Sequence, residues 1–325
     1  MKFLDCESGL FEVGSGVPQG SHLGPLLFIL FVNSVVDAVS DIHISIYADD
    51  MKLFLPVKSF DDCFKLQNAL NVFVDWCFAN KLQLNDDKCN VISFTRRKSL
   101  IEYDYRLLNI SLERCDSVTD LGVILDYELS MKLHVDYIVS KAMRLLGFIK
   151  RFGKEFNDIY VLKTLYFSYV RSTLEFGSVV WSPYFINSTL RIEAVQRNFT
   201  RYAVRLLDWR DPSNLPSYDH RLQLLGLESL TFRRKISEVV FCKDVMFGQI
   251  KSQSLSSQIV FKDNRFNLRS GHVLDVQSHR TCYGFNNPVD RAMRSYNSHS
   301  QMFNDNDSRD VIKKKMKKVS VRSNL

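Results

Sequence analysis

The sequence lacks the patterns that mark a membrane protein, a disulfide scaffold or a zinc module. Its most apolar run, Leu26–Val32, is far shorter than the roughly 20 residues that a membrane-spanning helix needs. The seven cysteines never occur as Cys-x-x-Cys and lack the paired histidine spacing of a zinc site, so we expect reduced, mostly structural thiols. Asp5 and Glu7 stand where a signal peptide would be apolar. We therefore expect an intracellular protein of the nucleus or cytoplasm, not a secreted one.

The charge is distributed unevenly along the chain. The 325 residues carry a formal net charge of +7, but residues 1–130 hold 11 basic and 19 acidic groups, whereas the remainder hold 32 basic and 17 acidic groups. Such asymmetry suggests a cation as the partner of the acidic part and nucleic acid or another acidic surface as the partner of the basic part. With 46% hydrophobic residues, the chain is also long enough for about two domains with real cores.

The first 130 residues predict helices mixed with strands. Apolar spacing from Ser21 to Val39 predicts one buried helix, and Ser59–Lys81 predicts an amphipathic helix capped by Ser59. Alternation over Ile42–Tyr47 and the run Met51–Leu55 predict a hairpin with two carboxylates at its tip. Further single strands are expected at 90–95, 107–112 and 118–125. These elements predict an α+β layer, an antiparallel sheet with helices on one face.

Beyond Ser130 the pattern is helical. Helices are expected at about 132–152, 158–176, 188–208 and 231–249, and the last 75 residues show the least periodicity. We predict three regions: an α+β domain at 1–128, a helical domain at 129–210, and a poorly defined helical C-terminal region with a basic tail at 211–325.

The adjacent carboxylates Asp49 and Asp50 are the first candidate for chemistry. Two carboxylates this close repel each other unless a cation lies between them, and hard oxygen ligands suit Mg²⁺ or Mn²⁺. A polar β-turn is the alternative interpretation, because Asp is common in turns.

A glycine-containing loop precedes the first expected helix. Residues 16–21 read Gly-Val-Pro-Gln-Gly-Ser, which places backbone amides and the Gln19 side chain at a helix N-terminus, where phosphates are favoured. An ordinary loop-to-helix turn is the alternative.

Together these blocks resemble the reverse transcriptases of non-LTR retrotransposons, particularly the jockey-like group. The resemblance rests on residues 16–28, Tyr47-Ala48-Asp49-Asp50, residues 80–85 with Lys88, and residues 121–126 with His134 and Ala142. It continues through Leu174-Glu175-Phe176-Gly177-Ser178, Trp181-Ser182-Pro183 and Glu193-Ala194-Val195-Gln196-Arg197, in the order of the family. Beyond residue 210 it weakens to scattered features.

The resemblance implies a role for each matching residue. Asp49 and Asp50 would hold the metal ions of a two-metal nucleotidyl transfer, with Mg²⁺ or Mn²⁺ as cofactor. The template and incoming-nucleotide pocket would be lined by Pro18, Gln19, Gly20 and Tyr47. Lys88 would lie near the pyrophosphate as a proton donor or charge stabiliser, with a solvated surface lysine as the alternative. Leu121 and Gly122 would form the primer grip. The implied partners are an RNA template, a DNA primer or duplex, and deoxynucleoside triphosphates, with no membrane.

Two basic segments follow. Arg197, Arg201 and Arg205 recur one turn apart opposite an apolar stripe, so they could follow a phosphate backbone, or they could form a solvated helix face. The run of Lys313, Lys314, Lys315, Lys317 and Lys318 could be a nuclear address, a nucleic-acid tail or a solvated end. In the family the helical middle of the chain would be the polymerase thumb.

One departure from the family limits the expected activity. The third metal-binding carboxylate of these polymerases comes from a strand well upstream of the Val-Pro-Gln-Gly block, and only 16 residues precede Val17. Asp5 lies too close to the block to take that position. The sequence therefore predicts a partial polymerase palm, truncated and inactive by itself. A non-catalytic nucleic-acid-binding remnant and an aggregation-prone half-palm are the alternatives.

Overall fold

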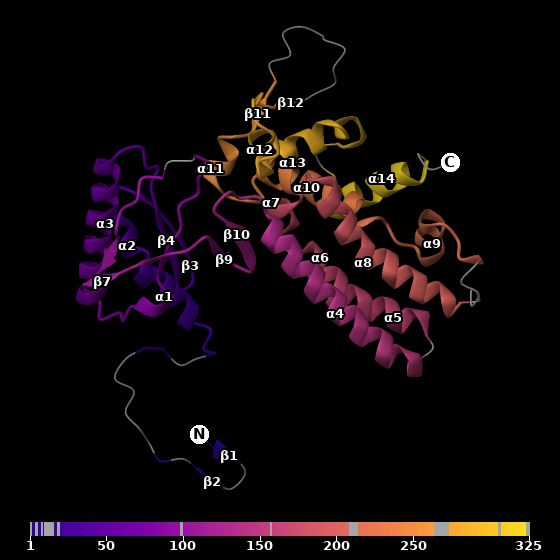
Figure 1. The fold of residues 1–325 in the computed structure, drawn as a ribbon, viewed down its shortest axis with the longest axis horizontal. Helices are drawn as coiled ribbons and strands as arrows, with labels where there is room; N and C mark the ends of the chain where they lie inside the picture. Colours follow the sequence, from indigo (N-terminus) through magenta and orange to yellow (C-terminus); the bar gives the residue numbers. More distant parts are fainter. Residues whose placement is uncertain are drawn as a thin grey trace. The chain divides into compact units, whose positions relative to one another are not determined.

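Helices and short strands build two compact units. The structure, a computed structural model, describes residues 2–3, 6–7, 9, 16–17, 20–97, 100–156, 158–207, 214–262, 273–304 and 307–322 (Figure 1). The mixture of elements confirms the predicted α+β class. The units are Met1–Asp116 and Ser117–Leu325.

The division between the units follows Asp116, upstream of residue 128, at which the sequence predicts the end of the first domain. The reason is the hairpin of β9 (Ser117–Asp120) and β10 (Val123–Asp126), whose Val123 is buried in the same core as the helices that follow. The hairpin therefore belongs to the second unit.

The first unit packs a hairpin and a short helix against one long helix. Its elements are β1 (Lys2–Phe3), β2 (Cys6–Glu7), α1 (Gly24–Val32), α2 (Ser34–Ala38), β3 (His43–Tyr47), β4 (Asp50–Phe54), α3 (Phe60–Ala79), the 3-10 turn η1 (Asp86–Lys88), β5 (Asn90–Val91), β6 (Arg106–Leu107), β7 (Ile110–Ser111) and β8 (Glu113–Arg114). Val35, Val39 and Phe73 are buried at the centre of its core, and Ile44 and Ile46 of β3 pack against it.

The start of α3 shows how local sequence fixes an element. The backbone N–H groups of Lys58 and Ser59 donate to the Asp62 carboxylate at 2.8 and 3.0 Å, which completes a capping box. These two bonds hold the pKa of Asp62 below its usual value. The predicted helix Ser59–Lys81 is confirmed as Phe60–Ala79.

The prediction of one buried helix from Ser21 to Val39 was wrong. The segment forms two helices that meet at Asn33, and in α1 only Gly24 and Val32 are buried, whereas Leu26 and Leu30 are 54% and 63% exposed. Nearly every residue of α1 is apolar, so its sequence does not single out one buried face.

Two of the predicted single strands are hairpins instead. Residues 107–112 turn back at Leu108, whose φ is 56°, so that β6 pairs with β7, and residues 118–125 turn at Leu121–Gly122. The strand expected at 90–95 is limited to Asn90–Val91, which pairs in parallel with β8. Among the described residues every strand has a single partner, so they do not form the larger antiparallel sheet that we expected.

The second unit is mostly helical. After β9 and β10 it contains α4 (Lys132–Phe156), α5 (Ile159–Leu165), the π-helical turn η2 (Tyr166–Arg171), α6 (Ser172–Glu175), α7 (Ser178–Trp181), α8 (Ile186–Arg205), α9 (Tyr218–Leu225), α10 (Leu230–Met246), α11 (Gln253–Ser256), β11 (Val260–Phe261), β12 (Leu274–Asp275), α12 (Cys282–Phe285), α13 (Pro288–Asn297), the 3-10 turn η4 (Ser300–Met302) and α14 (Arg309–Arg322). The four helices predicted beyond Ser130 are present with modest shifts of their ends, the second of them as the succession of α5, η2 and α6. The helices α7, α9, α11, α12, α13 and α14 are additional.

Two apolar clusters stabilise this unit, and α10 contributes to both. The first includes Trp181 and Phe199, both completely buried, and extends to Leu230 at the start of α10. The second joins Val239 of α10 to Met293 of α13. The C-terminal region thus has a core of its own.

The predicted basic tail is a packed helix. Ile312 and Met316 of α14 are each 1% exposed within the second cluster, and Lys317 lies 2.7 Å from the Glu228 carboxylate. Lys314 and Lys318 are exposed. None of the helices in the described ranges combines the length and the apolar character that a bilayer crossing requires.

Candidate active site and nucleic-acid-binding surface

The hairpin of β3 and β4 carries the paired carboxylates at its tip. Tyr47 pairs with Asp50, which leaves Ala48 and Asp49 as the turn. Ala48 has a φ of 52°, in the left-handed region that costs a residue with a Cβ atom about 1–2 kcal/mol. Such strain is often found next to functional groups. The predicted hairpin is therefore confirmed, with strain directly before its carboxylates.

Asp49 and Asp50 are both exposed, and in the described part of the chain neither side-chain carboxylate makes a hydrogen bond or ion pair. Their oxygen atoms suit Mg²⁺ or Mn²⁺ in chemistry. Two carboxylates are fewer than the ligands of a complete site, and no group of three His, Cys, Asp or Glu side chains among the described residues could hold a metal ion. The hairpin tip therefore presents two carboxylates that could serve as metal ligands.

The other residues predicted for this site are placed unequally. Tyr47 is 65% exposed beside the carboxylates. Gly20 has a φ of 85° in the turn before α1, and a Cβ atom added there would meet nothing within 4 Å, so its backbone angle rather than its space requires glycine. Pro18 and Gln19 lie outside the described residues.

Lys88 ends the turn η1, immediately before β5, and is exposed. Within the described ranges no hydrogen bond or ion pair connects its ammonium to Asp49 or Asp50. Among the described residues of the predicted site, Tyr47 and the two carboxylates lie together at the hairpin tip.

The second unit holds the predicted primer-grip residues. Leu121 and Gly122 form the two-residue turn of the β9–β10 hairpin, with φ of 44° and 84°, which is the left-handed geometry that tight hairpins favour. Leu121 is 45% exposed. A Cβ atom on Gly122 would lie 3.2 Å from the Phe176 ring, so the turn packs closely against the segment between α6 and α7.

The arginine row on α8 lies as the helical spacing predicted. Arg197, Arg201 and Arg205 are exposed, whereas Val195 and Phe199 on the other side of the helix are completely buried. The Arg197 guanidinium lies over the Tyr218 ring, 4.9 Å from its centre. The row is therefore available to an anionic partner.

Two basic residues that the sequence did not reveal lie beside this row: Lys150 is half-buried, and Arg221 is buried, with its Nε donating to the Thr200 hydroxyl at 3.2 Å. Burial, and then the charges of Arg205 and Arg201, lower the pKa of Lys150 on α4. Burial and the charge of Arg201 likewise lower the pKa of Arg221 on α9. We call these five residues the basic cluster. None of the five has an acidic partner among the described residues.

Comparison with known proteins agrees with the residue patterns. Residues 2–150, which include the carboxylate hairpin, match the family model described as reverse transcriptase (RNA-dependent DNA polymerase). Over this part, the chain is similar to reverse transcriptases.

Its relatives are retrotransposon polymerases. The RNA-directed DNA polymerase from mobile element jockey of Drosophila funebris is 31% identical over 142 residues, 40% of this chain and 15% of the relative. That of Drosophila melanogaster is 28% identical over 144 residues, 41% and 15% of the two chains. The probable RNA-directed DNA polymerase from transposon X-element of Drosophila melanogaster is 24% identical over 213 residues, 62% and 23%. The matches thus span less than a quarter of these relatives, and no solved structure matches.

The motifs of the reverse transcriptase resemblance have structural roles in the second unit. The buried Asp126 carboxylate accepts hydrogen bonds from the Ser130 and Met131 backbone N–H groups, at 2.9 and 3.0 Å, directly before α4. His134 Nδ1 accepts from the Ile124 N–H at 3.2 Å, which joins α4 to β10. These residues connect the hairpin to the helices.

A buried polar network accounts for the Glu193–Arg197 motif. The Glu193 carboxylate accepts from the N–H groups of Leu230 and Thr231, at 3.1 and 3.2 Å, and from the Tyr218 hydroxyl. Gln196 donates to the Tyr218 oxygen at 3.0 Å. Burial and the Glu193 charge raise the pKa of Tyr218 well above its usual value. The network therefore holds the Tyr218 ring against which the Arg197 guanidinium lies. The sequence indicated the residues of this motif but not the hydrogen bonds between them.

Proposed function

We propose that this chain is part of a non-LTR retrotransposon reverse transcriptase that holds a template and primer through its basic cluster and contributes Asp49 and Asp50 to the catalytic site. The observation that carries the proposal is the coincidence of the family match over residues 2–150 with two unpaired carboxylates at a strained hairpin tip. Its regions would correspond to a partial palm and a helical thumb.

Asp49 and Asp50 are the residues that would hold Mg²⁺ or Mn²⁺. When bound, such an ion supplies charge stabilisation for the transfer of a nucleotide to a primer 3′-hydroxyl. The carboxylates contribute negative charge at an exposed tip, where a polynucleotide and a triphosphate have access.

The remaining family positions receive auxiliary roles. Pro18, Gln19, Gly20 and Tyr47 would line the template and nucleotide pocket, with Tyr47 offering an exposed ring beside the carboxylates. Lys88 would face the pyrophosphate as a cation. In the second unit, the exposed Leu121 with Gly122 would contact the primer strand.

We further propose that the 325-residue chain binds nucleic acid without extending a primer. Two carboxylates with no third acidic partner among the described residues are too few for a two-ion site. Primer extension on a homopolymer template with Mg²⁺ or Mn²⁺ should give no more product for the chain than for its Asp49→Asn, Asp50→Asn variant. Template-dependent product that this variant loses would show that the chain holds a complete active site.

The binding part of the proposal rests on the basic cluster. Changing Arg197, Arg201 and Arg205 to Gln should weaken duplex binding and reduce the slope of log affinity against log salt by about 2.7, because each phosphate neutralised on duplex DNA contributes about 0.9.

The matched control changes three exposed lysines, Lys251, Lys314 and Lys318, to Gln, which removes the same charge from elsewhere in the second unit. It should keep the original slope. If only the control variant loses affinity for the duplex, the binding surface lies in the C-terminal region and not on α8.

A further inference from the structure

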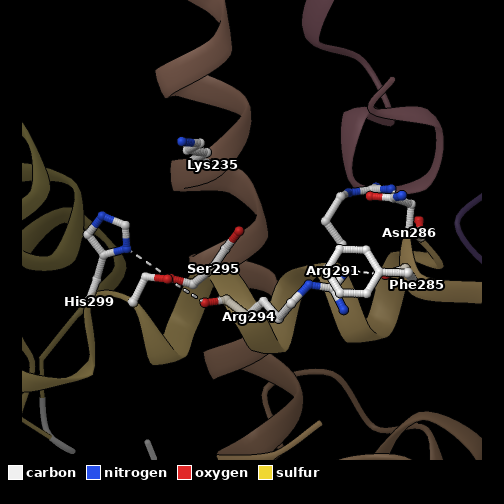
Figure 2. Close-up of a pocket in the computed structure, with 8 residues that line it drawn as sticks. Lys235, Phe285, Asn286, Arg291, Arg294, Ser295 and His299 are labelled. Carbon is white, nitrogen blue, oxygen red and sulfur yellow. Dashed lines mark hydrogen bonds between the residues drawn. The ribbon is translucent and has the colours of Figure 1, made fainter. Parts of the chain in front are cut away.

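A small cavity with basic walls is lined by residues of α10, of α13 and of the end of α12 (Figure 2). None of its described lining residues belongs to the basic cluster. Its volume is about 200 Å³. Three of its lining residues are the cations Lys235, Arg291 and Arg294, and no Asp or Glu lines it in the described part of the chain.

Arg291 is already neutralised. Its Nε donates to the Glu238 carboxylate at 2.6 Å, its Nη1 to the Asn286 carbonyl at 2.9 Å, and its Nη2 to the Val179 carbonyl. Ser295 also donates to Glu238, at 2.6 Å. Both oxygens of the Glu238 carboxylate are thus occupied, one by Arg291 and the other by Ser295. Arg291 therefore contributes little free positive charge to the cavity.

Arg294 is only partly satisfied. Its guanidinium lies 3.7 Å from the centre of the Phe285 ring, and its Nη2 donates to the Phe285 carbonyl (Figure 2). Its Nη1 is buried and has no hydrogen-bond partner in the part of the chain that the structure describes. Burial lowers the pKa of Arg294, because the charged form loses solvation there. A buried donor of this kind favours an acceptor that also carries negative charge.

Lys235 supplies a second cation. It is exposed on α10 and makes no ion pair with any described residue. The nearby acid Asp290 is occupied, since it pairs with His279 and accepts from the Asn287 side chain at 2.6 Å. The cavity therefore combines an unpaired guanidinium nitrogen with an unpaired ammonium.

We propose that this cavity binds a phosphate group, with Arg294 Nη1 and the Lys235 ammonium as its donors. A guanidinium matches the geometry of phosphate oxygens, and a lysine acts on phosphate as a point charge. Ligand sites for larger molecules usually measure about 300–1,000 Å³, so this cavity fits the phosphate rather than a whole nucleotide. The phosphate can belong to a nucleic-acid backbone or to a free nucleotide or pyrophosphate.

Titration of pyrophosphate into the full chain, measured by isothermal calorimetry, tests the proposal. The chain carries the three α8 Arg→Gln changes, so that the basic cluster does not contribute and failure of the proposed function does not affect the result. Lys235→Gln and Arg294→Lys should each weaken binding at least tenfold. Lys251→Gln, an exposed lysine outside the cavity, should change it less than twofold.

Absence of saturable binding, or equal binding by Lys235→Gln and the control, would overturn the proposal. Lys235 is exposed, so this variant remains informative if Arg294→Lys does not fold. Competition then identifies the source: displacement of pyrophosphate by single-stranded RNA indicates the nucleic-acid backbone, and displacement by a deoxynucleoside triphosphate but not by RNA indicates a free nucleotide.

Discussion

Single residues in left-handed conformations determine both hairpin tips that carry proposed site residues. Ala48 precedes the carboxylates, and Leu121 and Gly122 form the β9–β10 turn. At Ala48 and Leu121 the side chain makes this conformation costly. At Gly122 the cost is avoided, and the missing Cβ atom also leaves room for the Phe176 ring.

Gly122→Ala should therefore destabilise the chain by about 1–2 kcal/mol, because the left-handed backbone penalises a Cβ atom and Phe176 has to move. Gly147→Ala is the matched control: it lies in α4 with nothing within 4 Å of an added Cβ atom, so it should stabilise by up to about 1 kcal/mol. Urea unfolding followed by circular dichroism measures both. Equal effects of the same sign would contradict the role of the turn.

Among the elements, α1 exposes most of its apolar surface. Leu26, Ile29 and Leu30 are each more than half exposed. Exposed apolar patches of this kind promote association between molecules. The surface therefore supports the aggregation-prone alternative that the sequence left open.

Leu30→Lys should reduce self-association, measured by light scattering, and should change the free energy of unfolding by no more than about 0.5 kcal/mol, because the side chain is on the surface. Val35→Lys, one turn further along in α2, should unfold the first unit, since Val35 is completely buried and a buried charge has no partner there. Unchanged scattering by Leu30→Lys would rule out α1 as the associating surface.

Elements fixed by neighbouring residues could be predicted from the sequence. The capping box at Ser59 and Asp62 and the alternation in β3 are local, and both elements formed as expected. The turn at Leu108 could not be predicted, because a leucine rarely adopts a positive φ and the segment reads as one strand. The burial of α1 could not be predicted either, because its residues are apolar on every face and no single face is marked as the buried one.

The candidate site was predictable to the same extent. Asp49, Asp50 and the α8 arginines follow from a hairpin and a helical repeat, whereas their proposed roles stay predictions. Lys150 and Arg221 join the row only through the packing of three helices, which no spacing along the chain encodes. The cavity at Arg294 likewise depends on tertiary contacts between α12 and α13.

At the scale of the whole molecule, the two units have separate cores. Phe73 is 6% exposed in the core of the first unit, and Phe199 is buried in the second, stacked 3.9 Å from the Tyr166 ring. Chains with separate cores often unfold in more than one step.

Thermal unfolding should accordingly show two transitions. Phe73→Ala should lower the midpoint of one transition and Phe199→Ala that of the other. Each substitution should reduce the free energy of unfolding of its unit by about 3–5 kcal/mol, because it deletes a buried ring. Differential scanning calorimetry separates them, with the wild-type chain as the reference. A single transition that both variants lower equally would mean that the two cores unfold as one.

The position of α10 between two apolar clusters restricts changes in chain length. An α-helix turns about 100° per residue. One residue inserted in the middle of α10 would rotate Val239 away from Met293 if Leu230 kept its place, or displace Leu230 from the first cluster if the second were preserved. Seventeen residues, Leu230–Met246, thus form a segment in which substitutions at exposed positions are tolerated but a single insertion or deletion is not.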